Sequence, residues 1–239
     1  MLVLGIDTST KAVAAGLWSE DGLVAEISGA AHSAHSEQLL VHILALLDSA
    51  GRRLDQLGGI GVVVGPGSFT GLRIGIATAQ GLAESRGLLT VGLSSLEVLA
   101  QGAGYTADLV CPVIVARKGY VYCAVYEVSE DGPVPVRDPV SCRLEEMIPW
   151  IDQPMVFVGE GFMAHRVFFR AVLRDRVIEA PEASHRPSGR VVSYQAYKGI
   201  TAGHGHDPAL LVPEYLGPST AEINWMRREA KSSDPKNGS

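Results

Sequence analysis

A carboxylate followed by hydroxyl groups stands at the end of the first apolar run of the chain. The run from Leu2 to Ile6 is typical of a central strand buried on both faces, and Asp7, Thr8 and Ser9 follow it directly. Such a group at a strand end can bind phosphate, with the Asp7 carboxylate holding a magnesium-bound water molecule. The alternative is that Asp7 does no more than cap the hairpin that follows. The local sequence leaves both interpretations open.

A glycine-rich segment between a predicted strand and a predicted helix is the most distinctive part of the chain. It runs from Gly65 to Gly71, and Ser68 or Thr70 can cap the helix that follows. Backbone N–H groups at a helix start favour anions, so Gly67 and Ser68 belong to the same candidate phosphate site as the first strand end. No lysine follows the final glycine, which excludes a P-loop. Spacing alone favours the alternative, a structural turn without a ligand.

The histidines do not form a convincing metal site. His32 and His35 lie before or at the start of a predicted helix, and His42 lies two turns further on. Ligand pairs on a helix are usually three or four residues apart on one face. His204 and His206 stand in a glycine-rich loop without a third ligand nearby. No metal ion is therefore predicted.

The helix predicted over Ser36–Ala50 is more apolar than its own lobe requires. At 100° per residue its apolar side chains cover an arc of roughly 160°, whereas a surface helix needs about 100° to cover a core. Part of the apolar face is therefore left for another contact. The residues of this arc are Leu39, Leu40, Ile43, Leu44, Leu46 and Leu47.

A second helix, predicted over Leu72–Arg86, carries small residues at four-residue spacing. Gly75, Ala79 and Ala83 would let another helix approach closely, which would compensate for the cost of about 1 kcal/mol of a helical glycine. The two helices together predict one half of a helical bundle that another chain completes. The alternative is that both faces are buried within the same lobe.

The order of elements along the chain predicts an α/β fold made of two similar lobes. A three-stranded meander is followed by alternating helices and strands, the order of a ribonuclease-H-like lobe, and the second half repeats this order more loosely. Two such lobes in tandem indicate an actin-like (ASKHA) duplication, and one open α/β sheet is the alternative. The predicted divisions are 1–104 for the first lobe, 105–216 for a smaller second lobe and 217–239 for a segment that returns towards the first lobe and ends in a disordered tail.

Composition limits the partners and the compartment. The 239 residues are 46% hydrophobic and 19% charged, with a net charge of -6, so the chain is an ordinary globular protein that is poorly suited to hold a polyanion by itself. A partner would have to grip any nucleic acid. The three cysteines form no Cys-x-x-Cys pair, which fits a reducing compartment. No signal peptide and no apolar stretch of about 20 residues is present, so a cytoplasmic protein without membrane contact is predicted.

Several segments closely resemble the bacterial TsaB family, formerly YeaZ, in the right order from residue 1 to about 225. The Gly-Pro-Gly-Ser-Phe-Thr-Gly block is highly specific, and the resemblance of the second lobe is weaker. The segments that carry it are Gly5-Ile6-Asp7-Thr8-Ser9-Thr10, His35-Ser36-Glu37, Gly65 to Gly75, Gly92-Leu93-Ser94-Ser95-Leu96, Ala116-Arg117 before Val121-Tyr122, and Pro213-Glu214-Tyr215-Leu216.

The resemblance implies the actin-like fold and a non-catalytic role in forming threonylcarbamoyladenosine next to the anticodon of tRNA. The implied partners are the catalytic subunit TsaD, bound directly, and the small ATPase TsaE, with tRNA contacted only through the complex. No catalytic residue or cofactor is implied, although an active ATPase or small-molecule kinase that uses ATP and magnesium is the alternative. The residues predicted to contact TsaD, or a second copy of the chain, are Leu40, Leu44, Leu47, Gly75 and Ala79.

Overall fold

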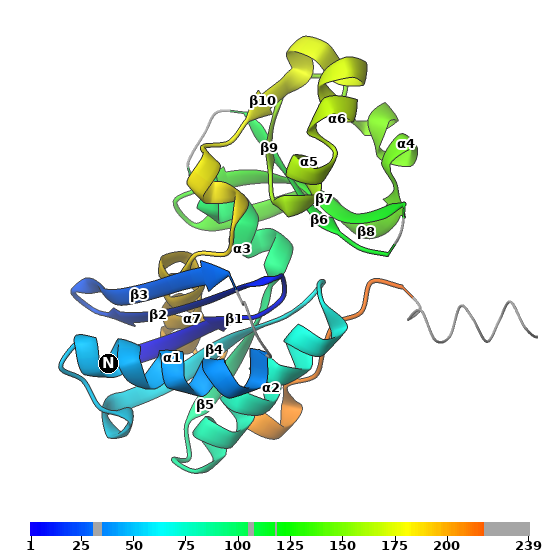
Figure 1. The fold of residues 1–239 in the computed structure, drawn as a ribbon. Coiled ribbons are helices and arrows are strands. Elements are labelled where there is room, and N and C mark those ends of the chain that lie inside the picture. The colour runs from blue at the N-terminus through cyan, green and yellow to red at the C-terminus, as the bar shows by residue number, and fades with distance from the viewer. Residues whose placement is uncertain (31–34, 105–107, 118, 218–239) are drawn as a thin grey trace, which may run out of the picture.

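The computed structural model describes residues 1–30, 35–104, 108–117 and 119–217, which form two lobes (Figure 1). Each lobe is built around a mixed five-stranded sheet. The strands of the first sheet are β1 (Leu2–Asp7), β2 (Ala12–Ser19), β3 (Gly22–Ala30), β4 (Leu57–Gly65) and β5 (Leu89–Ser94). The strands of the second sheet are β6 (Leu109–Val115), β7 (Tyr120–Ser129), β8 (Gly132–Arg143), β9 (Met155–Val158) and β10 (Val177–Glu179).

The helices connect these strands and cover the sheets. Among the described residues no helix is long and apolar enough to cross a membrane. The α-helices are α1 (His35–Ser49), α2 (Phe69–Glu84), α3 (Ser95–Gly102), α4 (Leu144–Met147), α5 (Glu160–Ala164), α6 (Arg166–Leu173) and α7 (Gly189–Thr201). Short 3-10 helices are η1 (Leu54–Gln56), η2 (Ile148–Trp150), η3 (Arg174–Arg176), η4 (Glu182–His185) and η5 (Pro208–Leu210).

Both sheets have the same strand order. The first reads β3-β2-β1-β4-β5 and the second reads β8-β7-β6-β9-β10. In each, an antiparallel meander is joined to two parallel strands. This repeated order is that of two ribonuclease-H-like lobes and confirms the predicted actin-like duplication. The alternative of a single open sheet is wrong.

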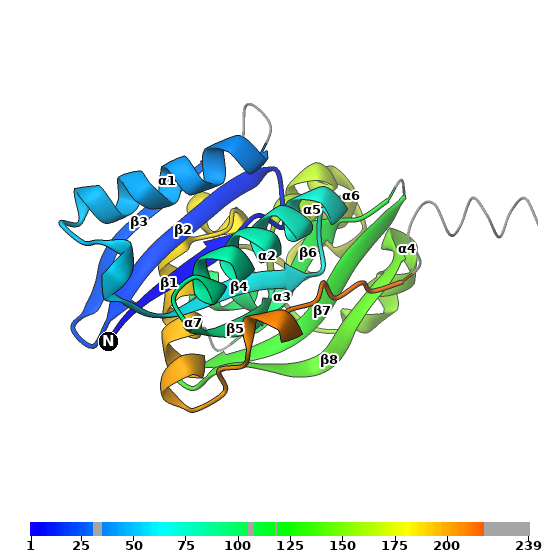
Figure 2. The same ribbon diagram turned by 90° about the horizontal axis from the view of Figure 1, so that it is seen from below.

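The first sheet is buried on both faces. Helices α1 and α2 lie side by side on one face (Figure 2), where they enclose a core that includes Leu4, Ile6 and Ile43. Helix α7 covers the other face and packs against Val3 and Val63. The alternation of Val3 and Leu4 between the two cores explains why the first strand is continuously apolar.

A row of glycines lets α7 approach the first sheet closely. Gly16, Gly5 and Gly61 are aligned across β2, β1 and β4. A side chain on Gly5 would collide with the backbone of Ser193, and one on Gly61 would collide with Ala196. Along this row the helix therefore lies close to the backbone of the strands, which requires glycine at these positions.

Helices α3 and α7 are not confined to the lobe whose strands they directly follow. Helix α3 follows β5 and contacts β4 and β5 as well as β6, β7 and β8 of the second sheet, whereas α7 follows β10 but contacts β1, β2 and β4 of the first sheet. Helix α7 thus does not complete the second lobe, although it follows the strands of that lobe in the sequence. The reason is the glycine row, which provides a flat surface for α7. The divisions at 104 and 216 stay predictions.

Replacing Gly81 with alanine is expected to stabilise the protein by about 0.5–1 kcal/mol. Gly81 lies inside α2, is exposed, and has open space where a side chain would stand. Alanine would therefore lower the entropy of the unfolded chain without a steric cost. Thermal unfolding of the two proteins measures this effect, and a lower melting temperature of the variant would contradict it.

Candidate functional site

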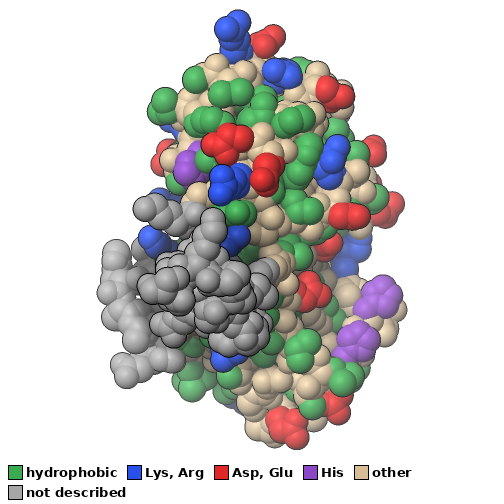
Figure 3. Space-filling view, turned by 90° about the vertical axis from the view of Figure 1, so that its right-hand side faces the viewer, with side chains coloured by type: hydrophobic (Ala, Val, Ile, Leu, Met, Phe, Trp, Pro, Cys, Tyr) green, Lys and Arg blue, Asp and Glu red, His purple; other side chains and the backbone are tan. Residues whose placement is uncertain are grey.

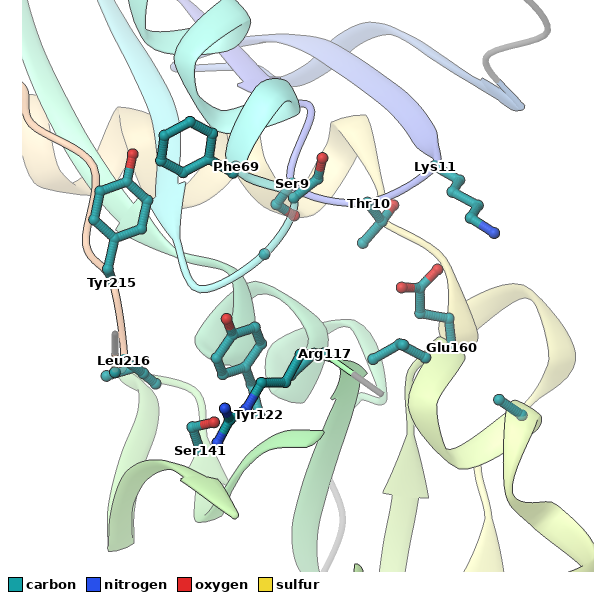
Figure 4. Close-up of a pocket in the computed structure, with 16 residues that line it drawn as sticks. Ser9, Thr10, Lys11, Phe69, Arg117, Tyr122, Ser141, Glu160, Tyr215 and Leu216 are labelled. Carbon is teal, nitrogen blue, oxygen red and sulfur yellow. The ribbon is translucent and has the colours of Figure 1, made fainter. Parts of the chain in front are cut away.

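A cavity of about 870 Å³ lies between the two lobes, and Figure 4 shows the side chains around it. The ends of β1 and β6, the start of α2 and the C-terminal segment all reach it. Of the predicted phosphate-site residues, Ser9, Gly67 and Ser68 line the cavity, whereas Asp7 and Thr8 are buried behind its wall. Its other labelled lining residues are Thr10, Lys11, Phe69, Arg117, Tyr122, Ser141, Glu160, Tyr215 and Leu216.

The end of β1 is hydrogen-bonded to the glycine-rich loop. The Ser68 N–H donates to the Ser9 carbonyl at 2.7 Å, and the Thr8 hydroxyl donates to the Gly71 carbonyl at 2.7 Å. A side chain on Gly67 would collide with the Ser9 carbonyl, and one on Gly71 with the Thr8 carbonyl. The glycines are therefore needed to bring two backbone segments together.

These contacts occupy the groups that a phosphate would need. The Ser68 N–H faces a protein carbonyl, and the Ser68 hydroxyl accepts from the Gly71 N–H as the cap of α2. The Ser95 hydroxyl further holds the loop by donating to the Pro66 carbonyl. These contacts favour the structural turn as the interpretation of the glycine-rich segment, whereas the Ser9 hydroxyl has no hydrogen-bond partner among the described residues, so the phosphate site stays a prediction.

The Asp7 carboxyl is also poorly placed for magnesium. It is fully buried, and its Oδ1 accepts the Ser9 N–H at 2.8 Å. Burial raises the pKa of Asp7 above its ordinary value of 3.8, although the hydrogen bond from Ser9 opposes this. A carboxyl that resists ionisation and already holds a backbone N–H is a cap at a strand end. This favours the capping alternative.

Asp7→Asn is expected to flatten the pH dependence of stability and to raise the melting temperature at neutral pH. The folded state binds the Asp7 proton more tightly than the unfolded state, so wild-type stability falls as pH rises from 3.8 through the folded pKa. Asparagine keeps an oxygen for the Ser9 N–H but never ionises. Melting curves at several pH values measure the difference, which should disappear in acid. A variant that is less stable at neutral pH would contradict the prediction.

The cavity offers little for acid–base or nucleophilic catalysis. Glu160 is the single acidic side chain among the described residues that line it, and burial raises its pKa while Lys11 opposes the rise. On the second lobe the Arg117 guanidinium stacks over the Tyr120 ring, 3.8 Å from its centroid. Because Glu160 is the one carboxylate that lines the described part of the cavity, no pair of carboxylates faces it there.

The two glycines at the start of α5, Gly159 and Gly161, have a structural use. A side chain on Gly159 or Gly161 would crowd the Val113 carbonyl of β6. The Gly159 N–H donates to Nδ1 of the buried His185, whose Nε2 lies 3.1 Å from the Ala180 carbonyl. The Gly159–Gly161 turn is therefore explained by the packing of α5 on the second sheet.

The outer face of α1 is apolar and exposed. Leu40 and Leu44 are 43% and 45% exposed, and Val41 between them is 60% exposed. Leu39 and Ile43 point into the core. Part of the apolar arc is therefore left over, as its width predicted. The set Leu40, Val41 and Leu44 is named the α1 face below.

Three of the five predicted contact residues are not on this surface. Leu47 is 2% exposed and Ala79 is fully buried, and both belong to the core under α1 and α2. Gly75 is also buried, and it lies so close to β1 and β4 that a side chain there would collide with the Thr8 hydroxyl and crowd Val62. The prediction for Leu47, Gly75 and Ala79 is corrected on this ground, since α2 uses its small residues to approach β1 and β4.

The C-terminal segment completes the rim of the cavity, which sequence reasoning missed. The Glu214 N–H donates to the Val64 carbonyl at 2.8 Å, so the segment follows β4. The rings of Tyr215 and Phe69 stack 5.4 Å apart, and the Arg73 guanidinium covers Phe69 at 3.9 Å. In the sequence, the run from Pro213 to Leu216 was noticed only because it resembles the TsaB family, and nothing in it predicted a place at the cavity.

Metal ligands do not gather in the parts of the chain that the structure describes. No group of three or more histidine, cysteine or acidic side chains there can hold a metal ion. The prediction that the histidines bind no metal includes His32, which lies outside the described residues, as does the predicted tail beyond residue 217.

Comparison with known proteins gives a consistent family. The sequence model of the protein family described as TsaD, tRNA N6-adenosine threonylcarbamoyltransferase, matches residues 22–225 of this chain. The tRNA threonylcarbamoyladenosine biosynthesis protein TsaB of Bacillus subtilis is 30% identical over 96% of this chain and 100% of its own length. TsaB of Haemophilus influenzae is 36% identical over 95% and 97%. A solved Pseudomonas aeruginosa protein, described as similar to peptidase YEAZ, superposes with a TM-score of 0.79 at 27% identity, over 90% of this chain and 99% of its own.

Proposed function

The chain belongs to the TsaB family and matches the TsaD family model over most of its length, and we propose that it is a non-catalytic subunit of the tRNA threonylcarbamoyladenosine-forming machinery. In this role it binds and stabilises the catalytic TsaD subunit. TsaD then transfers threonylcarbamoyl to the tRNA adenosine next to the anticodon. TsaE joins the two as a third component. The protein itself carries no catalytic residue.

The observation that carries the proposal is the exposed α1 face. Leu40, Val41 and Leu44 form an apolar stripe at helical spacing that the lobe does not cover. On the neighbouring helix α2, a shallow depression is lined by the mostly uncharged residues Phe69, Thr70, Arg73, Ile74, Ala77 and Thr78. An apolar centre with few charges is typical of a stable subunit interface. A helix pair of TsaD is the occupant that we propose.

A non-catalytic role is supported by what surrounds the cavity. The Ser9 carbonyl lies against Gly67 and accepts the Ser68 N–H, and Asp7 is buried away from the cavity. These features argue against the alternative of an active ATPase or kinase, which would need an open phosphate cradle and an ionised carboxylate. The chain would therefore act through its surface.

Contact with tRNA is proposed to run through the partners. The net charge of -6 opposes independent binding of a polyanion. On the face drawn in Figure 3, acidic and basic side chains are mixed across the second lobe rather than gathered by sign.

When TsaD is absent, two copies of the chain would cover the same α1 face by forming a homodimer.

A reconstituted reaction tests the proposed function. TsaD, TsaE, tRNA, ATP and threonylcarbamoyl-adenylate are combined with and without this chain, and the modified nucleoside is measured by mass spectrometry. We expect the product to form only when the chain is present. Full modification without it would contradict the proposal. Magnesium-dependent hydrolysis of ATP by the isolated chain would instead support the ATPase alternative.

A further inference from the structure

The three cysteines of the second lobe lie in one buried cluster that the proposed function does not use. Cys111 of β6, Cys123 of β7 and Cys142 of β8 belong to the same core. In the sheet, Cys123 is opposite Val140 while Val121 is opposite Cys142, so the two cysteines are diagonal neighbours. Their Sγ atoms lie 3.5 Å apart.

We propose that Cys123 and Cys142 form a reactive dithiol that a peroxide oxidises to a disulfide. The two sulfur atoms are already in contact and face each other across neighbouring strands. Closing the bond requires them to approach to about 2.05 Å. The register of the β7–β8 pair shifts between Cys123 and Val125, so the ladder of hydrogen bonds is interrupted directly beside Cys123.

Cys142 is the sulfur that reacts first. It is 7% exposed, whereas Cys123 and Cys111 are fully buried, and it lies on β8, the edge strand of its sheet. The hydrogen bond between the Cys123 and Cys142 sulfur atoms lowers the pKa of Cys142, while burial raises the pKa of Cys111 to about 12. The thiolate is the nucleophile in this chemistry, so Cys111 is the least reactive of the three.

The reaction balances with one molecule of hydrogen peroxide. The Cys142 thiolate attacks one peroxide oxygen and breaks the O–O bond, which gives a sulfenic acid and, after proton uptake, water. Cys123 then attacks the Cys142 sulfur, forms the S–S bond and displaces hydroxide, which takes the Cys123 proton to give a second water. Two thiols are oxidised and one peroxide is reduced. Because diagonal strand neighbours are wider apart than most disulfides, a thiol reductant should reverse the bond readily.

The bond would also stiffen the wall of the interlobe cavity. Tyr122 and Ser141 are opposite each other in the sheet and line the cavity. Each is the direct neighbour of one cysteine in its strand, with the thiol on the other face of the sheet. A covalent link between Cys123 and Cys142 would therefore limit the relative movement of Tyr122 and Ser141.

Peptide mapping of the oxidised protein tests the proposal. The purified full chain is treated with hydrogen peroxide, remaining thiols are alkylated under denaturing conditions, and the chain is digested with trypsin. Cleavage after Lys118, Arg137 and Arg143 places Cys111, Cys123 and Cys142 in three separate peptides. We expect the peptides 119–137 and 138–143 to appear as one linked species that a reductant separates. Absence of this species, with all thiols alkylated, would overturn the proposal.

Matched variants separate geometry from general reactivity. Cys111→Ser should keep the linked species, and Cys123→Ser should lose it while Cys142 becomes trapped by a sulfenic-acid reagent such as dimedone. In urea, loop length favours a bond between Cys111 and Cys123 only about twofold over one between Cys123 and Cys142, so the unfolded chain should give a mixture of linked peptides and the folded chain a single one. A folded chain that gives the unfolded pattern, or a Cys123→Ser variant without a sulfenic acid, would overturn the proposal.

Discussion

Leu44→Lys is expected to weaken binding to TsaD by at least about 30-fold, which corresponds to about 2 kcal/mol for the loss of a central interface residue. Leu44 is exposed on the α1 face near the middle of helix α1, so a charge there would be buried unpaired in the complex. The fold should remain, because the side chain leaves the core untouched and lysine favours helix. Titration calorimetry or copurification with TsaD measures the loss, and the oligomeric state of the isolated chain should change to monomer.

Val167→Lys is the matched control for this experiment. Val167 is 84% exposed on α6 of the other lobe, so the same apolar-to-basic change is made away from the α1 face. It should leave the affinity for TsaD unchanged. If Leu44→Lys binds as tightly as this control, the docking surface lies elsewhere on the molecule.

Gly75 shows why the docking residues could be predicted only in part. A glycine inside a helix indicates a close approach, and the structure has one, but the approaching group is the Thr8 hydroxyl of the same lobe. Spacing along a helix gives the width of its apolar face without the identity of its neighbour. Replacing Gly75 with a bulky residue would therefore damage the lobe itself and could not test an interface.

Local patterns predicted the elements better than the contacts between them. The opening three-stranded meander is present as predicted, and α1 begins and ends within one residue of the helix predicted over Ser36–Ala50, because apolar runs and turn residues are short-range signals. The position of α7 on the first sheet depends on strands more than a hundred residues earlier in the chain. The Arg73–Tyr215 contact joins residues 142 positions apart, so the cavity rim was beyond a local interpretation.

Gly5→Val is expected to destabilise the folded protein by at least about 3 kcal/mol and to lower its melting temperature by roughly 6–12 °C. The side chain would enter the backbone of α7 at Val192 and Ser193, which cannot rotate away as a side chain could. Gly16 and Gly61 flank Gly5 in the same row, so the helix would have to lift from three strands at once.

Gly29→Val is the control, since Gly29 lies in β3 with nothing within 4 Å among the described residues, and valine favours strands. It should melt near the wild-type temperature. If Gly5→Val does not fold, Gly5→Ala gives a smaller loss of the same origin, because the first carbon of any side chain already meets Ser193. Since α7 is the only described helix that covers this face of the first sheet through the glycine row, a Gly5 variant as stable as Gly29→Val would contradict its position. The glycine row thus makes the stability of the first lobe depend on α7. The chain supplies this helix only after all the strands of the second lobe.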